Sequence, residues 1–456
     1  MSEQHFVRSI RLPCAAGVAF AWHERPGALE RLTPPWEHVR VLHRSGTGVN
    51  DGARVELATR AGPFWFRWEA EHFGHEPGRQ FCDRLVRGPL PRWEHRHGFA
   101  DLGGGESVLT DDIGFELPGG VIGAFFGAAR MRRRLERLFT YRHAIIREDL
   151  SLIPAPPLRV LISGASGLVG QALIPFLTTQ GHSVVRLVRR KPATADEIFW
   201  DPSKGTLDLS SAGAIDAVVH LAGENIAAGR WTAARKESIL ASRVDGLRTL
   251  AAELRRTAYP PRVFLSASAV GFYGDRGDEL LTEDSPAGTG FLSEVCQTWE
   301  AELASAGGVG MRTAALRFGM VLTPAGGALA RMLPAFRFGI GGPLGDGRQW
   351  MSWIAIDDVL GVIAHALRDR RCEGPINAVA PEPVRNYEFT ARLAAILRRP
   401  VGFRAPAAGL RLAFGELADA LLLGSVRAMP SRLEESGYRF RLPMLDSALR
   451  HVLGQY

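Results

Sequence analysis

Lysine is almost missing from this chain of 456 residues. The sequence has 55 basic Lys and Arg residues, yet only Lys191, Lys204 and Lys236 are lysines. The net charge is +7 at pH 7, but the positive residues are scattered along the chain. Because proteins that bind nucleic acid by charge gather it on one face or stripe, we expect no nucleic-acid partner.

Cysteine and long hydrophobic runs are also scarce. The four cysteines, Cys14, Cys82, Cys296 and Cys372, form no CxxC pair, so neither a metal site nor a disulfide framework is predicted. A reducing compartment fits this pattern best. The N-terminus is polar, and the longest run of small apolar residues, 121–129, is too short to span a bilayer. We therefore expect a cytoplasmic protein without a membrane span.

The length and one proline-rich segment divide the chain. Cores stop growing near about 250–300 residues, so a chain of this length is expected to form more than one domain. Residues 151–157 read SLIPAPP, and a new pattern of apolar strands alternating with helices begins at Arg159. This predicts a first domain over residues 1–150 and a second from residue 158.

The first domain is predicted to be an α+β meander closed by a long helix. Strands are expected at 39–42, 53–57, 64–68, 80–83 and 108–113, and the helix carries apolar residues at helical spacing between 125 and 146. This order resembles the helix-grip fold of START and polyketide-cyclase-like proteins. The resemblance implies an apolar ligand in an internal pocket. The alternative is that Phe64, Phe66 and Trp68, on one face of a strand, fill a core with Trp93.

The second domain begins with the pattern of a dinucleotide site. A strand at 159–163 leads into a glycine-rich turn and an apolar helix, and a second strand follows at 183–188. The glycines permit a tight turn, close approach of a pyrophosphate, and close packing of helix on strand. The pattern predicts a Rossmann-type, doubly wound parallel sheet, with cofactor contacts at Gly164, Ser166, Gly167, Leu168, Val169 and Gly170.

The end of the second strand bears on the choice of cofactor. NAD-binding domains usually place an acidic residue there, whereas this chain has Arg189, Arg190 and Lys191. Guanidinium groups can bind a 2′-phosphate bidentately, so we expect NADP(H) rather than NAD(H). The alternative is that these side chains simply face solvent.

Several further segments identify a family resemblance. They are Leu221-Ala-Gly-Glu-Asn225, Arg317-Phe-Gly-Met-Val-Leu322, Trp353-Ile-Ala-Ile-Asp-Asp358 and Ser431-Arg-Leu-Glu-Glu-Ser-Gly437. Together with the glycine turn they resemble the extended short-chain dehydrogenase/reductases, in particular an uncharacterised epimerase-like family, over residues 158–455. The resemblance implies a Rossmann domain over 158–395 and a short C-terminal domain over 396–456. It also implies cofactor contacts at Leu221, Ala222, Gly223 and Arg317.

The catalytic residues implied by that resemblance are incomplete. The superfamily uses a Ser together with a Tyr and a Lys spaced as YxxxK, and only Ser268 matches. The helix expected to hold YxxxK carries Leu292 and Cys296 at those positions, and no lysine follows Lys236. Ser268, Tyr273 and Cys296 are therefore the candidate catalytic residues, the alternatives being a packed aromatic ring for Tyr273 and a buried thiol for Cys296.

Polar residues near the expected crevice are candidates for substrate contacts. They are Glu224 and Asn225 after one strand, and Arg348 and Gln349 in a glycine-rich loop at 341–350. The favoured function is an NADP(H)-dependent oxidoreductase or epimerase-like enzyme acting on a small molecule. Two alternatives stay open: a non-catalytic NADP(H) sensor, which the missing Tyr and Lys favour, and a carrier of hydrophobic ligands. The sequence names neither substrate nor oligomeric state.

Overall fold

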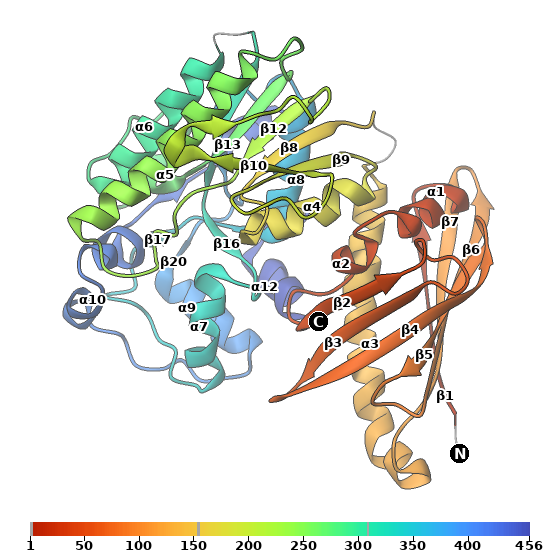
Figure 1. Cartoon of the computed structure of the whole chain (residues 1–456). Coiled ribbons are helices and arrows are strands. Elements are labelled where there is room, and N and C mark those ends of the chain that lie inside the picture. The colour runs from red at the N-terminus through yellow and green to blue at the C-terminus, as the bar shows by residue number, and fades with distance from the viewer. Residues whose placement is uncertain (1–2, 153–155, 308–309) are drawn as a thin grey trace. The chain divides into compact units, whose positions relative to one another are not determined.

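The computed structural model describes residues 3–152, 156–307 and 310–456 (Figure 1). The chain divides into two compact units, one comprising residues 1–157, 175–181 and 456, the other residues 158–174 and 182–455. Part of the proline-rich segment predicted as the joint, residues 153–155, lies outside the described residues. None of the helices in the described ranges combines the length and apolarity needed to cross a membrane.

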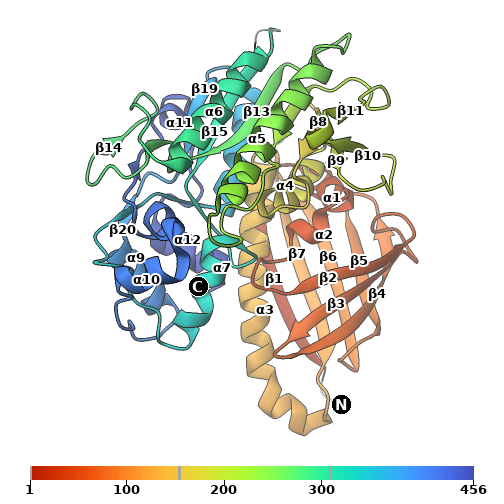
Figure 2. The same ribbon diagram turned by 60° about the vertical axis from the view of Figure 1, so that its left-hand side comes forward.

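The first unit contains a seven-stranded antiparallel sheet in the order β1-β7-β6-β5-β4-β3-β2, with a long helix, α3 (Gly120–Leu150), running along it (Figure 2). Its strands are β1 (Gln4–Leu12), β2 (Val39–Ser45), β3 (Arg54–Ala61), β4 (Phe64–Glu76), β5 (Gln80–Arg87), β6 (Arg92–Gly103) and β7 (Glu106–Glu116). Two short helices, α1 (Ala16–Glu24) and α2 (Ala28–Arg31), follow β1.

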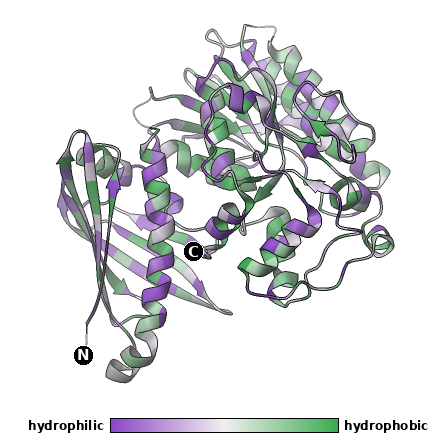
Figure 3. Ribbon diagram, turned by 180° about the vertical axis from the view of Figure 1, so that it is seen from behind, coloured by the Kyte–Doolittle hydropathy of each residue, from purple (hydrophilic) through white to green (hydrophobic). Residues whose placement is uncertain are grey.

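The core of this unit lies between one face of the sheet and the helices. Phe139 of α3 packs with Phe6, Ile113 and Phe115, and Trp22 of α1 is fully buried. The outward side of α3 is arginine-rich and hydrophilic (Figure 3). Trp68 packs edge-on against Trp93, their ring centroids 5.4 Å apart.

Phe64 and Phe66 behave differently from Trp68. They are 66% and 38% exposed, so neither side chain is a core residue. Of the three aromatic residues that share this strand face, only Trp68 packs against Trp93, and both of these rings are half-buried.

The second unit is built on an eight-stranded sheet in the order β11-β10-β9-β8-β12-β13-β15-β19. The strands are β8 (Arg159–Ser163), β9 (Ser183–Val188), β10 (Glu197–Asp201), β11 (Thr206–Leu207), β12 (Ala217–His220), β13 (Val263–Ala269), β15 (Arg312–Phe318) and β19 (Gly374–Ala378). All adjacent pairs are parallel except β10 and β11. This is the predicted Rossmann-like α/β fold.

The order in which the chain forms the strands changes direction at one place in this sheet, between β8 and β12. From β8 the chain passes through α4 (Leu168–Thr179) to β9 on one side. From β12 it passes through α5 (Ala233–Leu254) to β13 on the other side. Because parallel crossovers are right-handed, the two helices cover opposite faces, and the sheet opens between the carboxyl ends of β8 and β12. Helix α6 (Phe291–Ala306) packs beside α5 (Figure 1).

The remaining elements complete the second unit. The helical ones are η1 (Pro202–Lys204), η2 (Val270–Tyr273), α7 (Gly327–Arg337), α8 (Ile356–Arg368), α9 (Asn386–Ile396), α10 (Ala407–Phe414), η4 (Ala418–Leu423), α11 (Ser431–Glu435) and α12 (Leu445–Leu453). Short strands pair as β14 (Leu280–Leu281) with β21 (Arg427–Ala428), β16 (Met320–Leu322) with β18 (Trp353–Ala355), and β17 (Trp350–Met351) with β20 (Val384–Arg385).

Two neighbouring carboxylates at the start of α8 hold the C-terminal segment. Asp358 accepts hydrogen bonds from the backbone N–H groups of Arg441 and Leu442, at 2.8 and 3.0 Å, and from the Tyr438 hydroxyl. Asp357 lies 3.0 Å from Nε2 of His451. The Asp-Asp pair that the sequence pattern singled out therefore ties the last residues of the chain to α8.

Candidate functional site

The glycine turn after β8 has the geometry that the sequence predicted. Gly164 adopts φ +73, and a Cβ there would lie 2.6 Å from the carbonyl carbon of Leu221. A Cβ on Gly170 would lie 2.3 Å from the Gly164 carbonyl oxygen. The first glycine therefore brings the turn against the end of β12, and Gly170 lets α4 start close to the turn.

The same turn leaves polar groups at the start of α4. Ser166 and Gly167 form the tip of the turn, and α4 begins at Leu168 and Val169. The first N–H groups of any helix have no partner within the helix and attract anions. This end of α4 can therefore hold a phosphate group.

The end of β12 meets this turn. Leu221 donates its N–H to the Ser163 carbonyl at 3.2 Å, and Ala222 donates to the Ser163 hydroxyl at 3.4 Å. Gly223 lies against Arg243, whose guanidinium carbon would be 3.2 Å from a Cβ at that position. The six predicted residues of the glycine turn and the three of this segment thus lie together at the carboxyl ends of β8 and β12.

The two arginines after β9 differ in their partners. Arg190 forms a bidentate ion pair with Glu197, with N–O distances of 2.7 and 2.8 Å. This hydrogen bond, more than any other contact, lowers the pKa of Glu197 to about 2. Arg189 is exposed, and its side chain forms no hydrogen bond or ion pair within the described residues. Arg189 is therefore the freer of the two to meet an anionic group.

Three polar residues stand in register at the carboxyl ends of neighbouring strands. Ser268 of β13 pairs with Arg317 of β15, which pairs with Asn377 of β19. Glu300 of α6 accepts a hydrogen bond from the Ser268 hydroxyl at 2.6 Å and a bidentate pair from Arg317 at 2.9 and 2.7 Å. Arg317 is 3% exposed, so this ion pair is buried beneath the crevice edge.

Tyr273 belongs to the same network but faces inward. Its ring is fully buried, and its hydroxyl lies 2.7 Å from Asn377 Oδ1 and accepts a hydrogen bond from Arg317 at 2.9 Å. Burial raises the pKa of Tyr273, which Arg317 only partly offsets. These contacts match the packed-aromatic alternative for Tyr273, and its catalytic role stays a prediction.

Helix α6 places the two residues at the YxxxK positions on one face. The Leu292 side chain would lie 3.4 Å from a Cβ on Gly271, and Cys296 Sγ lies 3.7 Å from the Ala269 carbonyl. Burial raises the pKa of Cys296 to about 11, so at neutral pH it is a neutral thiol. The helix is thus where the motif requires it, with an apolar side chain and a protonated thiol in place of Tyr and Lys.

Glu224 and Asn225 make local contacts at the crevice edge. Glu224 forms an ion pair with Arg235 at 2.7 Å, and its carbonyl accepts from Arg243. Asn225 is exposed, and its side chain accepts from the N–H of Ala227 at 2.9 Å, closing a turn. Both stay predictions as substrate contacts.

The two candidate residues in the glycine-rich loop at 341–350 differ in burial. Gln349 is 7% exposed, and its amide donates to the carbonyls of Leu344 and Leu422 at 3.2 and 2.8 Å, which holds the loop to η4. Arg348 is exposed. Of this pair, Arg348 has the side chain available to a substrate.

Several residues of this site escaped sequence reasoning. Glu197, Asn377 and Arg243 are each defined by a partner outside their own strand or helix, namely Arg190, Tyr273 and Glu224. His220 is fully buried, its Nδ1 lies 2.6 Å from the Ser163 hydroxyl, and burial lowers its pKa to about 3. The signal that could have found Asn377 is its place near the end of a buried strand, two residues after Pro375.

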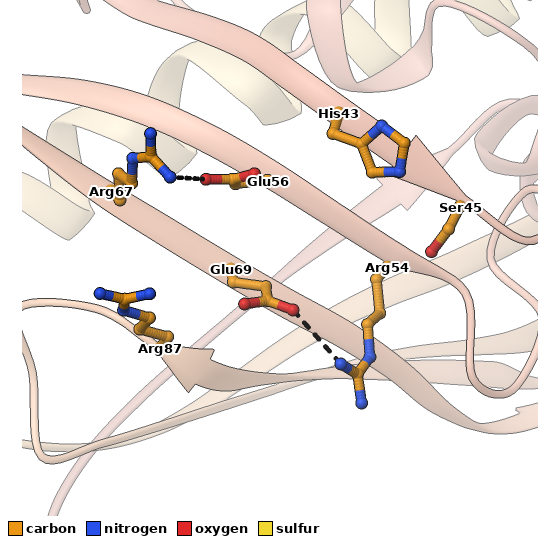
Figure 4. Close-up of a pocket in the computed structure, with 7 residues that line it drawn as sticks. All are labelled: His43, Ser45, Arg54, Glu56, Arg67, Glu69 and Arg87. Carbon is orange, nitrogen blue, oxygen red and sulfur yellow. Dashed lines mark hydrogen bonds and ion pairs between the residues drawn. The ribbon is translucent and has the colours of Figure 1, made fainter.

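The first unit carries a surface pocket of about 360 Å³ on its sheet (Figure 4). Its charged walls pair with one another: Arg67 lies 3.0 Å from Glu56, and Arg54 lies 3.3 Å from Glu69. Its lining is polar and suits a charged ligand better than the apolar one expected for this unit. The lining residues are His43, Ser45, Arg54, Glu56, Arg67, Glu69 and Arg87.

The parallel sheet and the glycine turn between β8 and α4 define a protein of the Rossmann class. Residues 160–378 match the model of the NAD dependent epimerase/dehydratase family, and residues 405–452 match a domain of unknown function. The chain is 41% identical over 293 residues to an epimerase family protein of Mycobacterium bovis, covering 64% of this chain and 97% of that protein. The chain belongs to this epimerase family.

Solved structures agree with this assignment. A nucleoside-diphosphate sugar epimerase from Corynebacterium glutamicum has a TM-score of 0.79 and 35% identity, covering 98% of this chain and 90% of its own. The human epimerase family protein SDR39U1, solved with NADPH, has a TM-score of 0.60 and 34% identity, covering 65% of this chain and 99% of its own.

Proposed function

We propose that this protein is an NADP(H)-dependent oxidoreductase or epimerase-like enzyme that acts on a small molecule. The observation that carries the proposal is the glycine turn, where a Cβ at Gly164 or Gly170 would collide with backbone atoms at 2.6 and 2.3 Å. The turn thereby brings backbone N–H groups and the start of α4 to the sheet opening, where dinucleotides bind in this fold. A relative at 34% identity was solved with NADPH, which supports the same ligand here.

The residues present fit a nicotinamide dinucleotide. The N–H groups from Ser166 to Gly170 would hold the pyrophosphate, and the small residues Ala222 and Gly223 leave room for the ribose beside it. When bound, the nicotinamide would supply or accept a hydride. Among the residues near the reacting end, Ser268 is the one that matches the superfamily's substrate-holding serine.

Ser268 is the residue that would hold the substrate oxygen. Its hydroxyl donates to Glu300 at 2.6 Å, so its lone pairs remain to accept a hydrogen bond from a substrate hydroxyl. Arg317 fixes Glu300 bidentately and so fixes the direction of the Ser268 hydroxyl. Cys296 is bonded to the Ala269 carbonyl at the same strand end and is buried, so its catalytic role stays a prediction.

The preference for NADP(H) is assigned to Arg189. Because Arg190 already satisfies Glu197 in a bidentate pair, Arg189 is the guanidinium left to bind a 2′-phosphate. Hydrogen bonds to charged groups contribute about 1.5–3 kcal/mol, equivalent to about 10–100-fold in affinity. Arg189→Ala is therefore expected to weaken NADPH binding by at least about 10-fold and to leave NADH binding unchanged.

The test is a fluorescence titration of the full chain with NADPH and with NADH. Arg190→Ala is compared with Arg189→Ala, and Arg256→Ala, whose side chain is 82% exposed, serves as the control that should change neither affinity. Failure of the wild type to bind either nucleotide would remove the proposed function. Equal loss of NADPH and NADH affinity in Arg189→Ala would contradict the assignment of the phosphate to that residue.

A second candidate is a sensor of NADP(H) without turnover. The specific observation in its favour is that Tyr273 and Cys296 are both buried and bonded within the protein, and Leu292 replaces the usual tyrosine. Turnover of bound cofactor with any carbonyl, hydroxyl or sugar-nucleotide substrate would exclude this candidate. Tight binding with no turnover of these substrates would favour it.

We also propose a START-like role, the binding of an apolar ligand, for the first unit. A sheet wrapped along a long C-terminal helix supports it, and a co-purifying apolar ligand found by mass spectrometry would be its signature. The cytoplasm remains the proposed location.

A further inference from the structure

The interior of the first unit holds a cluster of histidines and carboxylates that the proposed function does not use. Four of its members come from the sheet: Asp83 of β5, His95 and His97 of β6, and Asp111 of β7; His143 of α3 completes it. The side chains of His95, Asp111 and His143 are 4%, 3% and 5% exposed. Charged and polar groups are rarely this buried unless they pair with one another or hold a metal.

We infer that Asp83, His95 and His97 form a binding site for a divalent transition-metal ion, a class to which Zn²⁺ belongs. One donor atom from each of the three residues lies within 4.8 Å of the others. Two imidazoles and one carboxylate are a donor set that such ions accept, with further positions open to water or a ligand.

The distances within the trio match the spacing of ligands around an ion. Asp83 Oδ2 lies 3.4 Å from His95 Nδ1 and 3.7 Å from His97 Nε2. Direct hydrogen bonds between charged partners are shorter, at about 2.7–2.9 Å. With metal–ligand bonds of about 2.0–2.2 Å, two ligands of a tetrahedral ion lie about 3.3–3.6 Å apart. The three side chains therefore converge on a space of the size of an ion.

Asp111 orients His95 toward that space and lies close to His97. Its Oδ1 lies 3.0 Å from His95 Nε2 and 2.8 Å from His97 Nδ1, although the second contact is not aligned as a hydrogen bond. Its Oδ2 lies 2.7 Å from His143 Nε2. A carboxylate behind a histidine fixes the tautomer that presents the other ring nitrogen to a metal. Here that leaves His95 Nδ1 and His97 Nε2 facing Asp83.

A neighbouring ring nitrogen points to the same conclusion. His23 is 6% exposed, and its Nδ1 is bonded to the Ala19 carbonyl at 2.8 Å. Its Nε2 has no hydrogen-bond partner among the described residues, and its ring centroid lies 6.0 Å from that of His97. A buried acceptor without a partner costs stability unless something meets it, and a water bound to the metal would do so.

The competing explanation is a metal-free network that carries a proton. Burial alone would lower the pKa of His95, but its interactions with Asp111 and Asp83 raise it to about 9 in the ion-free chain. A protonated His95 would then balance part of the carboxylate charge. The two explanations differ in whether the chain takes up one ion at defined ligands.

The experiment uses the full chain stripped with EDTA. It is titrated with Co²⁺, followed by visible absorption, and with Zn²⁺ in competition with a fluorescent chelator. The wild type is expected to bind one ion per chain. Asp83→Asn and His97→Gln should weaken binding by at least about 100-fold, and Asp111→Asn by about 10–100-fold, as second-layer changes do. Circular dichroism checks that each variant is folded.

Two matched controls separate this site from adventitious binding. Asp112→Asn changes the next residue of β7, which faces the other side of the sheet and is 45% exposed, and His5→Gln changes a histidine that is 60% exposed. Neither should alter the affinity. The inference is overturned if the wild type takes up no stoichiometric ion, or if Asp83→Asn and His97→Gln bind as the wild type does. The wild-type titration decides the matter by itself should a variant fail to fold.

Discussion

At the scale of single residues, the polar side chains at the carboxyl ends of the strands form hydrogen bonds and ion pairs with one another. Tyr273 is the clearest case, because its hydroxyl joins Arg317 and Asn377 inside the core. Tyr273→Phe leaves both partners short of a bond, and an unsatisfied buried polar group costs about 1–3 kcal/mol. We expect the free energy of unfolding of the second unit to fall by this amount, while NADPH affinity is unchanged.

Urea denaturation followed by tryptophan fluorescence measures this change. Tyr259→Phe, at a side chain that is 79% exposed, is the control and should have no effect. A catalytic tyrosine would behave in the opposite way, since its loss would abolish turnover and leave stability intact. A Tyr273→Phe protein as stable as the wild type would contradict the structural role.

The sequence predicted the residue type wherever the backbone conformation requires a particular residue. It did not predict which side chains pair with one another. The glycines of the turn follow from steric demands that any chain must meet there. The bidentate pair of Arg190 with Glu197 joins residues seven positions apart, across the connection from β9 to β10. Nothing in the local pattern distinguishes Arg190 from Arg189, so the sequence predicted the charge but not which arginine is free.

At the scale of secondary structure, prediction depended on whether the inward positions of a strand are apolar. The parallel strands β8, β9, β12 and β13 are nearly continuous apolar runs and were predicted. β6 was not, because two histidines lie between the aromatic rings at its inward positions. Two of those histidines, His95 and His97, are the proposed metal ligands. The polar histidines that indicate a metal site therefore also interrupt the apolar pattern by which a strand is recognised.

The close packing at the start of α4 can be tested by substituting Gly170. Gly170→Ala would place a Cβ 2.3 Å from the Gly164 oxygen and 2.9 Å from the Ala165 Cα, and both contacts are to backbone. The turn must shift, so we expect a loss of about 1–3 kcal/mol of stability in the second unit. NADPH affinity, measured by fluorescence titration, should fall by at least about 10-fold as the N–H groups move.

The matched control for this change is Gly17→Ala in α1, where no atom lies within 4 Å of the added Cβ. That variant should keep both its stability and its affinity. Normal NADPH binding by a folded Gly170→Ala protein would show that the turn does not hold the cofactor.

At the scale of the whole molecule, two units with separate cores carry two candidate sites of different chemistry. The first unit holds the histidine and carboxylate cluster and the second holds the glycine turn. A ligand that binds only the folded form stabilises the unit that binds it, by about 2.7 kcal/mol at 100 times Kd. For units of this size each kcal/mol raises Tm by about 2–4 °C.

Calorimetry of the full chain should therefore separate the two sites. NADPH at 100 times Kd is expected to raise the melting transition of the second unit by about 5–10 °C, and Zn²⁺ to raise that of the first unit. His97→Gln should reduce only the effect of Zn²⁺, and Gly170→Ala only that of NADPH, because the two residues lie in different units. If one ligand shifted both transitions in the wild type and both shifts vanished in a single variant, the two sites would be coupled, and a regulatory role for the first unit would replace the independence expected here.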